Sequence, residues 1–118
     1  MLDLCRLTAR EATALLRRGE VSPLDLIDAA EARIATVDPA INAIPIRCFD
    51  RARAHARRIM QDRTSSDDNR AHLRGLPIVV KDLTPVAGVR WTDGSRVHAD
   101  RIACFWVGSS ERSRDYQC

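Results

Sequence analysis

The chain has 118 residues, of which 45% are hydrophobic and 30% charged, and its formal net charge is +3. This composition is typical of one globular domain, and the small charge gives no reason to expect a nucleic acid as a partner. No apolar run approaches the roughly 20 residues that a helix needs to cross a bilayer. The N-terminus also lacks the basic and then apolar order of a secretory signal. These absences predict a cytoplasmic protein with no membrane partner.

The first predicted helix begins after Thr8. Thr8 and Glu11 have the spacing of a capping box, in which the side chain of each residue binds the backbone amide of the other. Apolar residues then recur at helical spacing until Gly19, a residue type that commonly follows the last turn of a helix. The sequence therefore predicts a short amphipathic helix between these two signals.

The second predicted helix follows at once. Ser22 is a favoured N-cap residue, and Pro23 suits the first helical position because its missing amide hydrogen would have no helical acceptor there. Apolar residues continue at helical spacing to Asp38 and Pro39, where proline is expected to end the helix. Residues 43–47 are apolar but contain a proline, so they predict at most an edge strand.

A third helix is predicted over residues 50–63, and the polar residues 61–70 predict an exposed loop after it. Residues 76–80 are apolar without alternation, which is typical of a strand buried on both faces. The sequence thus predicts an α/β fold in which N-terminal helices precede one core strand.

Lys81 stands at the end of that predicted strand. The chain has 19 basic residues, and Lys81 is the single lysine among arginines. An arginine keeps its proton in a protein, whereas the pKa of a buried lysine can fall far enough for the amine to act as a base. We therefore take Lys81 as the candidate catalytic residue. Asp82 is interpreted as a polar partner at the strand end and not as an acid–base group.

The cysteines and histidines do not predict a metal site. No two cysteines form a Cys-x-x-Cys pair, and no histidine lies at metal-ligand spacing. A cytoplasmic location also favours reduced thiols over a disulfide framework. We therefore expect no bound metal and four free thiols. The cysteines are Cys5, Cys48, Cys104 and Cys118.

A series of segments makes the chain recognisable. The segments are Leu7-Thr8-Ala9-Arg10-Glu11, residues 18–23, residues 38–43, residues 73–82 and residues 88–95. The most specific of them has the pattern Gly-x-Pro-x-x-x-Lys-Asp and contains Lys81. In this order the segments resemble the N-terminal part of the amidase signature family of serine amidohydrolases. The resemblance covers about residues 6–103, and the common order of the segments carries more weight than any one of them.

The resemblance implies a mixed sheet wrapped by helices, and hydrolysis of carboxamide C–N bonds by a Ser–cis-Ser–Lys triad without a metal or organic cofactor. Lys81 matches the triad lysine. A desolvated lysine can take a proton through the bridging serine, so that the second serine attacks the amide and forms an acyl-enzyme that water cleaves. The implied substrate is a small amide. Which amide it is, and whether the role is that of a general amidase or of a tRNA-dependent amidotransferase subunit, stays open.

The two triad serines have no full match in these residues. In the family, the bridging serine lies in a Gly-Gly-Ser-Ser-Gly-Gly segment beyond the lysine, and the nucleophile lies further on. Gly108-Ser109-Ser110 is similar to that segment only in part, because it runs into Glu111-Arg112 where glycine's conformational freedom is needed. We assign no catalytic role to Ser109 or Ser110. Trp91 also stands where the family usually carries threonine.

We therefore predict that residues 1–103 are the N-terminal part of an amidase-like domain and that residues 104–118 are a non-matching tail, as an interrupted reading frame would produce. A truncated chain without both serines is expected to be inactive alone. Its apolar faces would lack the rest of the sheet, which favours self-association. A Lys81 ammonium group in solvent, away from any sheet, would argue against an inherited catalytic lysine.

Two other functions are weighed against amide hydrolysis. One is a non-catalytic helical module that docks on a full-length amidase or on another protein. The other is a nucleic-acid binder that uses the arginines of the third predicted helix, among them Arg57 and Arg58. That helix has no interleaved aromatic residues and is flanked by acidic ones, so a solvated helix face is the better interpretation.

Overall fold

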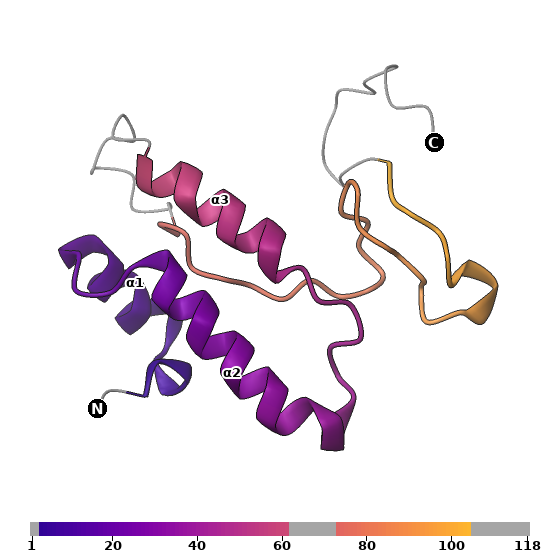
Figure 1. The fold of residues 1–118 in the computed structure, drawn as a ribbon, viewed down its shortest axis with the longest axis horizontal. Coiled ribbons are helices and arrows are strands. Elements are labelled where there is room, and N and C mark those ends of the chain that lie inside the picture. Colours follow the sequence, from indigo (N-terminus) through magenta and orange to yellow (C-terminus); the bar gives the residue numbers. More distant parts are fainter. Residues whose placement is uncertain (1–2, 62–72, 105–118) are drawn as a thin grey trace. The chain divides into compact units, whose positions relative to one another are not determined.

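A computed structural model of the chain describes residues 3–61 and 73–104. It forms two compact units, Met1–Ile78 and Val79–Cys118. Figure 1 shows the helices in chain order. In the described part of the first unit they are the 3-10 helix η1 (Leu4–Arg6) and the α-helices α1 (Ala9–Arg18), α2 (Pro23–Ile41) and α3 (Phe49–Gln61), and in that of the second unit there is the 3-10 helix η2 (Arg96–His98).

Helix α1 begins and ends as the sequence predicts. The Glu11 amide donates to Thr8 Oγ1 over 3.3 Å, and the Thr8 amide donates to Glu11 Oε2 over 2.7 Å, which completes the capping box. Gly19 closes the helix in the left-handed region at φ +68°, where its amide donates to Leu16 O over 3.2 Å. Both ends of the helix are therefore set by contacts between residues that are close in sequence.

Helix α2 also starts as predicted but ends later. Ser22 and Asp25 form its capping box, with Pro23 in the first turn. The expected end at Asp38 and Pro39 is wrong, because the helix includes Pro39 and reaches Ile41. A proline deprives only the carbonyl four residues earlier of its donor, and the helix continues here for less than a further turn. Asn42 then closes it at φ +53°, with its amide donating to Asp38 O over 2.6 Å.

The side chain of Asp38 explains why residues 43–47 are not a strand. Asp38 is buried, with 6% of its surface exposed, and its Oδ1 accepts the amides of Ala43 over 2.8 Å and Ile44 over 3.1 Å. Arg47 adds a 3.4 Å ion pair to the same carboxylate. The expected edge strand is therefore wrong, because a carboxylate takes the amides that a neighbouring strand would bind.

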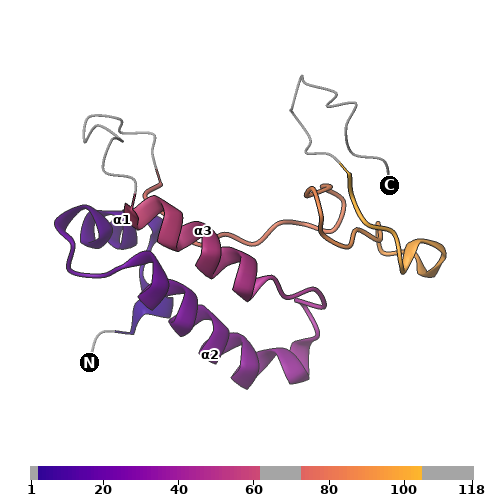
Figure 2. The same cartoon turned by 45° about the horizontal axis from the view of Figure 1, so that its top comes forward.

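Helix α3 runs antiparallel to α2 and packs beside it, as Figures 1 and 2 both show. Leu26 and Ile27 of α2 and Ala56 of α3 are buried. The predicted helix is confirmed up to Gln61, and the predicted loop after it lies largely outside the described residues. Helices α2 and α3 thus provide most of the small apolar core of the first unit.

A tight turn at Leu73–Leu76 seats the chain against the start of α2. The Leu76 amide donates to Leu73 O over 2.9 Å, and the two central residues have positive φ, +54° at Arg74 and +85° at Gly75. A Cβ atom at Gly75 would lie 2.8 Å from Cγ of Pro23. Only glycine combines this backbone conformation with this closeness, so the pattern Gly75-Leu76-Pro77 has a structural reason.

The predicted core strand over residues 76–80 is not found. Within the described residues there is no strand, and the side chains of Ile78, Val79 and Val80 are 70%, 78% and 47% exposed. The described residues therefore do not show the expected strand buried on both faces. An apolar run indicates burial, but a strand also needs a neighbouring backbone that accepts and donates hydrogen bonds. The described part of the fold is helical, and the β part of the α/β prediction is absent from it.

The second unit is held by a hairpin-like pairing. The Gly88 amide donates to Ala103 O over 2.7 Å, and the Ala103 amide donates to Val89 O over 3.0 Å. Arg90 and Ile102 form an isolated antiparallel bridge next to these contacts. Ala103 is buried, with 3% of its surface exposed.

Among the helices of the described part, none has the length and apolar character required to span a bilayer.

Candidate functional site around Lys81

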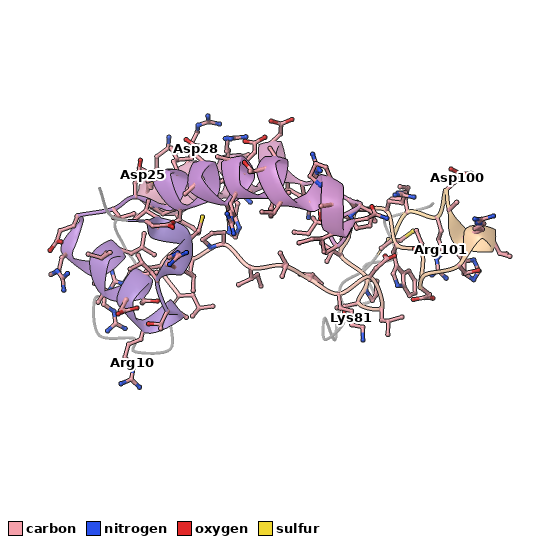
Figure 3. All side chains as sticks on the ribbon, turned by 90° about the horizontal axis from the view of Figure 1, so that it is seen from below. Arg10, Asp25, Asp28, Lys81, Asp100 and Arg101 are labelled. Atoms are coloured by element: carbon pink, nitrogen blue, oxygen red, sulfur yellow. The ribbon has the colours of Figure 1, made fainter. Side chains whose placement is uncertain are left out.

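Lys81 lies between residues that make no backbone hydrogen bond within the described part of the chain and residues that do. Before it, no backbone hydrogen bond within the described residues involves Ile78, Val79 or Val80. After it, Lys81 O accepts the Thr84 amide over 2.8 Å and so opens a turn. The Lys81 side chain is exposed and points away from the ribbon (Figure 3). The structure therefore places the ammonium group in solvent and on no strand, which is the arrangement that would argue against a catalytic lysine.

Asp82 is bound through both its side chain and its backbone. Its Oδ1 accepts the Thr92 amide over 2.9 Å, its Oδ2 accepts the Thr92 hydroxyl, and its carbonyl accepts the Asp93 amide over 3.2 Å. The Thr92 hydroxyl and then the Thr92 amide hold the pKa of the Asp82 carboxyl below its usual value, because both donate to the ionised form. These contacts agree with the interpretation of Asp82 as a polar partner, since donors to the charged form make it a poor proton acceptor.

The residues that bind Asp82 form a compact turn. Thr92 Oγ1 accepts the Gly94 amide over 3.2 Å, and Thr92 O accepts the Ser95 amide over 2.9 Å. Asp93 and Gly94 both have positive φ, +53° and +68°. Ser95 then caps η2, where its hydroxyl accepts the Val97 amide over 3.3 Å. Asp82 is therefore bound to a turn that lies ten residues further along the chain.

Arg101 braces the other side of this turn. Its guanidinium carbon lies 3.6 Å from the centre of the Trp91 ring, in the position of a cation–π contact. Its Nε donates to Trp91 O over 3.0 Å, and its Nη2 forms an ion pair with Asp93 Oδ2 over 2.7 Å. Arg101 therefore contacts the residues on both sides of Thr92. Sequence reasoning missed both Thr92 and Arg101: Thr92 lay inside a recognised segment, whereas nothing in the sequence distinguished Arg101 from the other arginines.

The sequence predicts no metal site from its cysteines and histidines. Among the described residues, no group of three or more histidine, cysteine, aspartate or glutamate side chains could hold a metal ion. Cys5 and Cys48 are free thiols as expected, but Cys104 takes part in a disulfide bond. The expectation of four free thiols is therefore wrong, because disulfide formation depends on the geometry of two thiols as well as on redox conditions. Ser109 and Ser110 lie outside the described residues.

The arginines of α3 differ in their contacts. Arg53 pairs with Asp28 of α2 over 2.7 Å and also with Glu31. The hydrogen bonds from Arg53 to Glu31 and then to Asp28 raise the pKa of Arg53. Arg53 therefore holds two helices together, whereas Arg57 and Arg58 are exposed. This division agrees with a solvated helix face.

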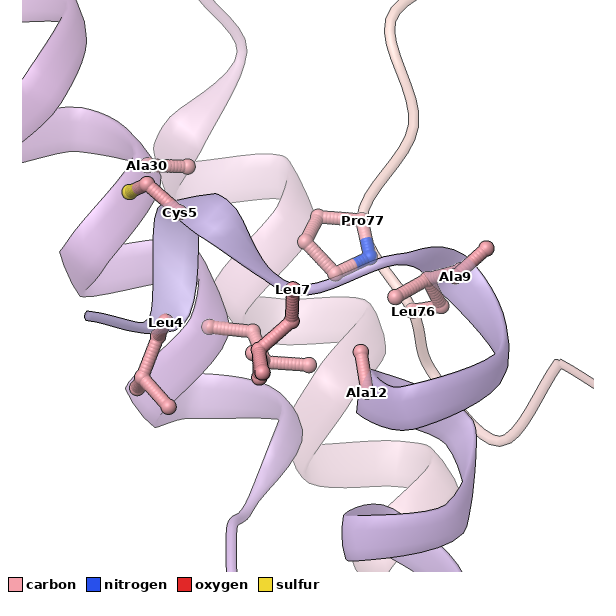
Figure 4. A pocket seen from close by; sticks show the side chains of 9 residues that line it. Leu4, Cys5, Leu7, Ala9, Ala12, Ala30, Leu76 and Pro77 are labelled. Carbon is pink, nitrogen blue, oxygen red and sulfur yellow. The ribbon is translucent and has the colours of Figure 1, made fainter. Parts of the chain in front are cut away.

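An apolar hollow of about 250 Å³ lies in the first unit among η1, α1, α2 and residues 76–77 (Figure 4). Leu7, Ala12 and Leu26 are among the residues that line it, and Cys5 provides a thiol. That thiol donates to Ala29 O over 3.3 Å. None of the described residues that line the hollow is charged, so it offers no carboxylate, amine or guanidinium for acid–base chemistry.

Comparison with known proteins identifies the family. The model of the amidase family matches residues 25–105, a span that includes Lys81, Asp82, Thr92 and Arg101. The chain therefore belongs to the amidase family, as its motifs predict.

Several curated relatives carry the same name, which is that of a glutamyl-tRNA(Gln) amidotransferase subunit. The relative from Anaeromyxobacter dehalogenans (strain 2CP-C) is 40% identical over 95 residues, which are 80% of this chain and 19% of the relative. The relative from Roseiflexus castenholzii (strain DSM 13941 / HLO8) is 37% identical over 97 residues, 82% of this chain and 19% of the relative. The relative from Synechococcus sp. (strain WH7803) is 42% identical over 82 residues, 70% of this chain and 17% of the relative. The chain thus spans about a fifth of the length of the relatives it matches, 19% for the first of them.

Proposed function

We propose that this chain is the N-terminal part of an amidase-family catalytic domain that hydrolyses a small carboxamide through an acyl-enzyme, with Lys81 as the triad lysine. The proposal rests on one observation: the family match over residues 25–105 contains the segment Gly75–Asp82, the most specific of the recognised motifs. The role of the lysine is to accept a proton from the bridging serine and to return it to the leaving amine.

The exposed position of Lys81 requires a further step in this proposal. A lysine becomes an effective base where burial removes its amine from water. We propose that residues 76–80 form a strand when the remaining part of an amidase sheet lies beside them, and that this strand removes Lys81 from water. The exposed side chains of Ile78 and Val79, whose backbone groups pair with none of the described residues, support this, because both are features of a strand without its neighbour.

The sequence content supports the proposal that these residues alone do not turn over an amide. They contain no Gly-Gly-Ser-Ser-Gly-Gly segment, and Gly108-Ser109-Ser110 continues into two charged residues. Without a hydroxyl attacker, a lysine base has no nucleophile to activate. We propose that the amidase-like part ends near residue 103 and that the residues after it add nothing to the site.

The class of substrate follows from the relatives only as a proposal. Their shared name describes an amidotransferase. We therefore favour, within the amidase family, an amidotransferase role over that of a general amidase. An assay that compares ammonia release from glutamine with release from other linear carboxamides separates these two roles.

The test is a chimera in which residues 7–103 of this chain replace the matching segment of the Anaeromyxobacter dehalogenans relative. We expect the 118-residue chain to release no ammonia and the chimera to release it. Lys81→Arg keeps the positive charge but cannot give up a proton, so it should abolish turnover in the chimera. Arg10→Lys, on the exposed face of α1, is the matched control and should leave turnover unchanged.

A chimera that stays active with Lys81→Arg would overturn the assignment of the base. Amide hydrolysis by the 118-residue chain alone, lost in Lys81→Ala, would instead show that these residues already contain a nucleophile. No contact of the described residues favours the alternative of a non-catalytic docking module, and Arg53 of α3 is paired with Asp28 and Glu31 and is not available to a nucleic acid.

A further inference from the structure

We propose that Asp82 is a positioning residue for Lys81, and that its contact with the turn at Thr92 determines where the lysine side chain stands. This inference rests on the proposed function, because it assigns to Lys81 a catalytic role that depends on its place. It goes beyond that function in naming a second and a third residue, Asp82 and Thr92, on which the lysine depends.

The chain just before Lys81 makes no backbone hydrogen bond within the described part of the fold that could hold the lysine in place. The three preceding residues make no backbone hydrogen bond within the described residues, and their side chains are largely exposed. The position of Lys81 is therefore set from its C-terminal side, where Lys81 O accepts the Thr84 amide and where Asp82 begins its contacts.

Asp82 joins the residues next to Lys81 to the turn at Thr92 by several hydrogen bonds. Its two carboxylate oxygens accept the amide and the hydroxyl of Thr92, and its carbonyl accepts the Asp93 amide. A residue bound through side chain and backbone has little freedom to rotate. The peptide unit between Lys81 and Asp82 is consequently anchored to the turn.

The turn at Thr92 is itself stabilised by further contacts. Thr92 Oγ1 accepts the Gly94 amide as well as donating to Asp82, and Arg101 contacts Trp91 and Asp93 on either side. Hydrogen bonds to a charged acceptor are about twice as strong as neutral ones. An ionised Asp82 therefore transmits the order of this turn to the neighbouring lysine.

The unique lysine makes a direct test possible. Labelling the full chain with [15N]lysine gives one backbone amide signal, that of Lys81. We expect Asp82→Ala to shift this signal and broaden it, and Thr92→Val, which removes the hydroxyl but keeps the shape, to shift it in the same direction. Thr92→Ser restores the hydroxyl and should return the signal toward its original place.

The matched control is Asp93→Asn, in the same turn. It weakens the ion pair with Arg101 but removes no contact of the Asp82 side chain. We expect the Lys81 signal to stay in place in this variant. A signal that ignores Asp82→Ala, or that moves as far with Asp93→Asn, would overturn the proposal, because the effect would then be general loss of order.

Kinetics of the chimera distinguish this inference from the proposed function. Asp82→Ala should lower kcat by about 10- to 100-fold with KM nearly unchanged, the effect of misplacing a catalytic group by about 1 Å. Full activity with Asp82→Ala, together with inactivity of Lys81→Arg, would refute the positioning role and leave the function intact. Activity of Lys81→Arg would refute the function, and the labelled signal would still report whether Asp82 places Lys81.

Discussion

The two units of this chain are stabilised in different ways. In the first, each of α1 and α2 begins with a capping box, and packing of α2 against α3 buries Leu26, Ile27 and Ala56. The described part of the second contains no α-helix, and its buried apolar residues are Pro85 and Ala103. A polar network replaces the core there, with Asp82 on the Thr92 turn and Arg101 on Trp91 and Asp93.

This difference shows which contacts support the candidate catalytic lysine. The helices depend on signals three or four residues apart and on a small apolar seam, neither of which involves Lys81. In the second unit, Asp82 binds Thr92 ten residues further along the chain, and we propose that this contact positions the neighbouring Lys81. Substitutions in the first unit should therefore change the stability of the helices, whereas substitutions in the second should change the surroundings of the lysine.

The largest expected effect is at the turn that seats the chain on α2. Gly75→Ala places a Cβ atom 2.8 Å from Pro23 Cγ, at a backbone φ of +85°. The left-handed conformation and the overlap together should lower the free energy of unfolding of the first unit by roughly 2–4 kcal/mol. Urea unfolding followed by circular dichroism at the helical band measures this.

Gly19→Ala is the matched control for that prediction. Gly19 has φ +68° but no atom within 4 Å of an added Cβ. Only the conformational penalty of about 1–2 kcal/mol then applies. Equal losses at the two glycines would mean that the contact between Gly75 and Pro23 contributes nothing.

The next effect concerns the polar network of the second unit. Arg101→Lys keeps the charge but loses the planar group that stacks on Trp91 while donating to Asp93 and to Trp91 O. We expect the free energy of unfolding of this unit to fall by about 1–2 kcal/mol. Fluorescence of Trp91 in a Trp106→Phe background reports the transition.

Arg96→Lys makes the same chemical change on an exposed residue of η2. It should alter the transition by no more than about 0.5 kcal/mol. If Arg101→Lys were equally mild, the second unit would not depend on the contacts of Arg101.

A smaller effect is expected at the start of α1. Thr8→Ala removes the hydroxyl that accepts the Glu11 amide and should cost about 1 kcal/mol. Thr13→Ala, in the same helix, removes a hydroxyl that donates to Ala9 O and should cost nothing, because alanine is the better helix former. Circular dichroism measures the helical content of both variants. A loss in Thr8→Ala alone would show that the capping hydrogen bond, and not the replacement of threonine by alanine, stabilises α1.

The smallest effect is the dependence of the helices on pH. The backbone amides of Thr8 and Ser22 lower the pKa of Glu11 and Asp25 respectively, because each donates to the ionised carboxylate. A carboxyl whose pKa is lowered by folding stabilises the fold above its ordinary pKa of about 4 and loses that contribution as the pH falls through the lower folded value. Helicity should therefore be constant above about pH 5 and decline below about pH 4.

The double variant Glu11→Gln, Asp25→Asn tests the origin of that decline. It keeps polar side chains at both caps but removes the titrating groups, so its helicity should change less over the same range. Asp38, whose pKa the Ala43 amide lowers, should account for part of the dependence that remains. An identical acid transition in the double variant would assign the whole effect to other carboxylates.

The sequence was enough to predict the family and where α1 and α2 begin. It also predicted where α1 ends and the extent of α3 up to Gln61. Thr8, Ser22 and Gly19 act on residues within four positions of themselves, so their meaning does not depend on the rest of the fold. The end of α2 and the structure of residues 43–47 were not predictable. The end of α2 depends on the left-handed Asn42, whose amide donates to the backbone carbonyl of Asp38, whereas the amides of residues 43 and 44 bind the buried Asp38 carboxylate. Nothing in the sequence shows that this side chain turns inward.

By itself, the sequence determined where the first two helices begin, which family the chain belongs to and that Lys81 is its only lysine. Local capping contacts and a collinear set of motifs contain that information. Only the tertiary structure decided that residues 76–80 are exposed, that Asp82 binds the Thr92 turn and that Arg101 stacks on Trp91. These features depend on which distant residue comes close, and that choice is made by the packing and hydrogen bonding of the folded chain.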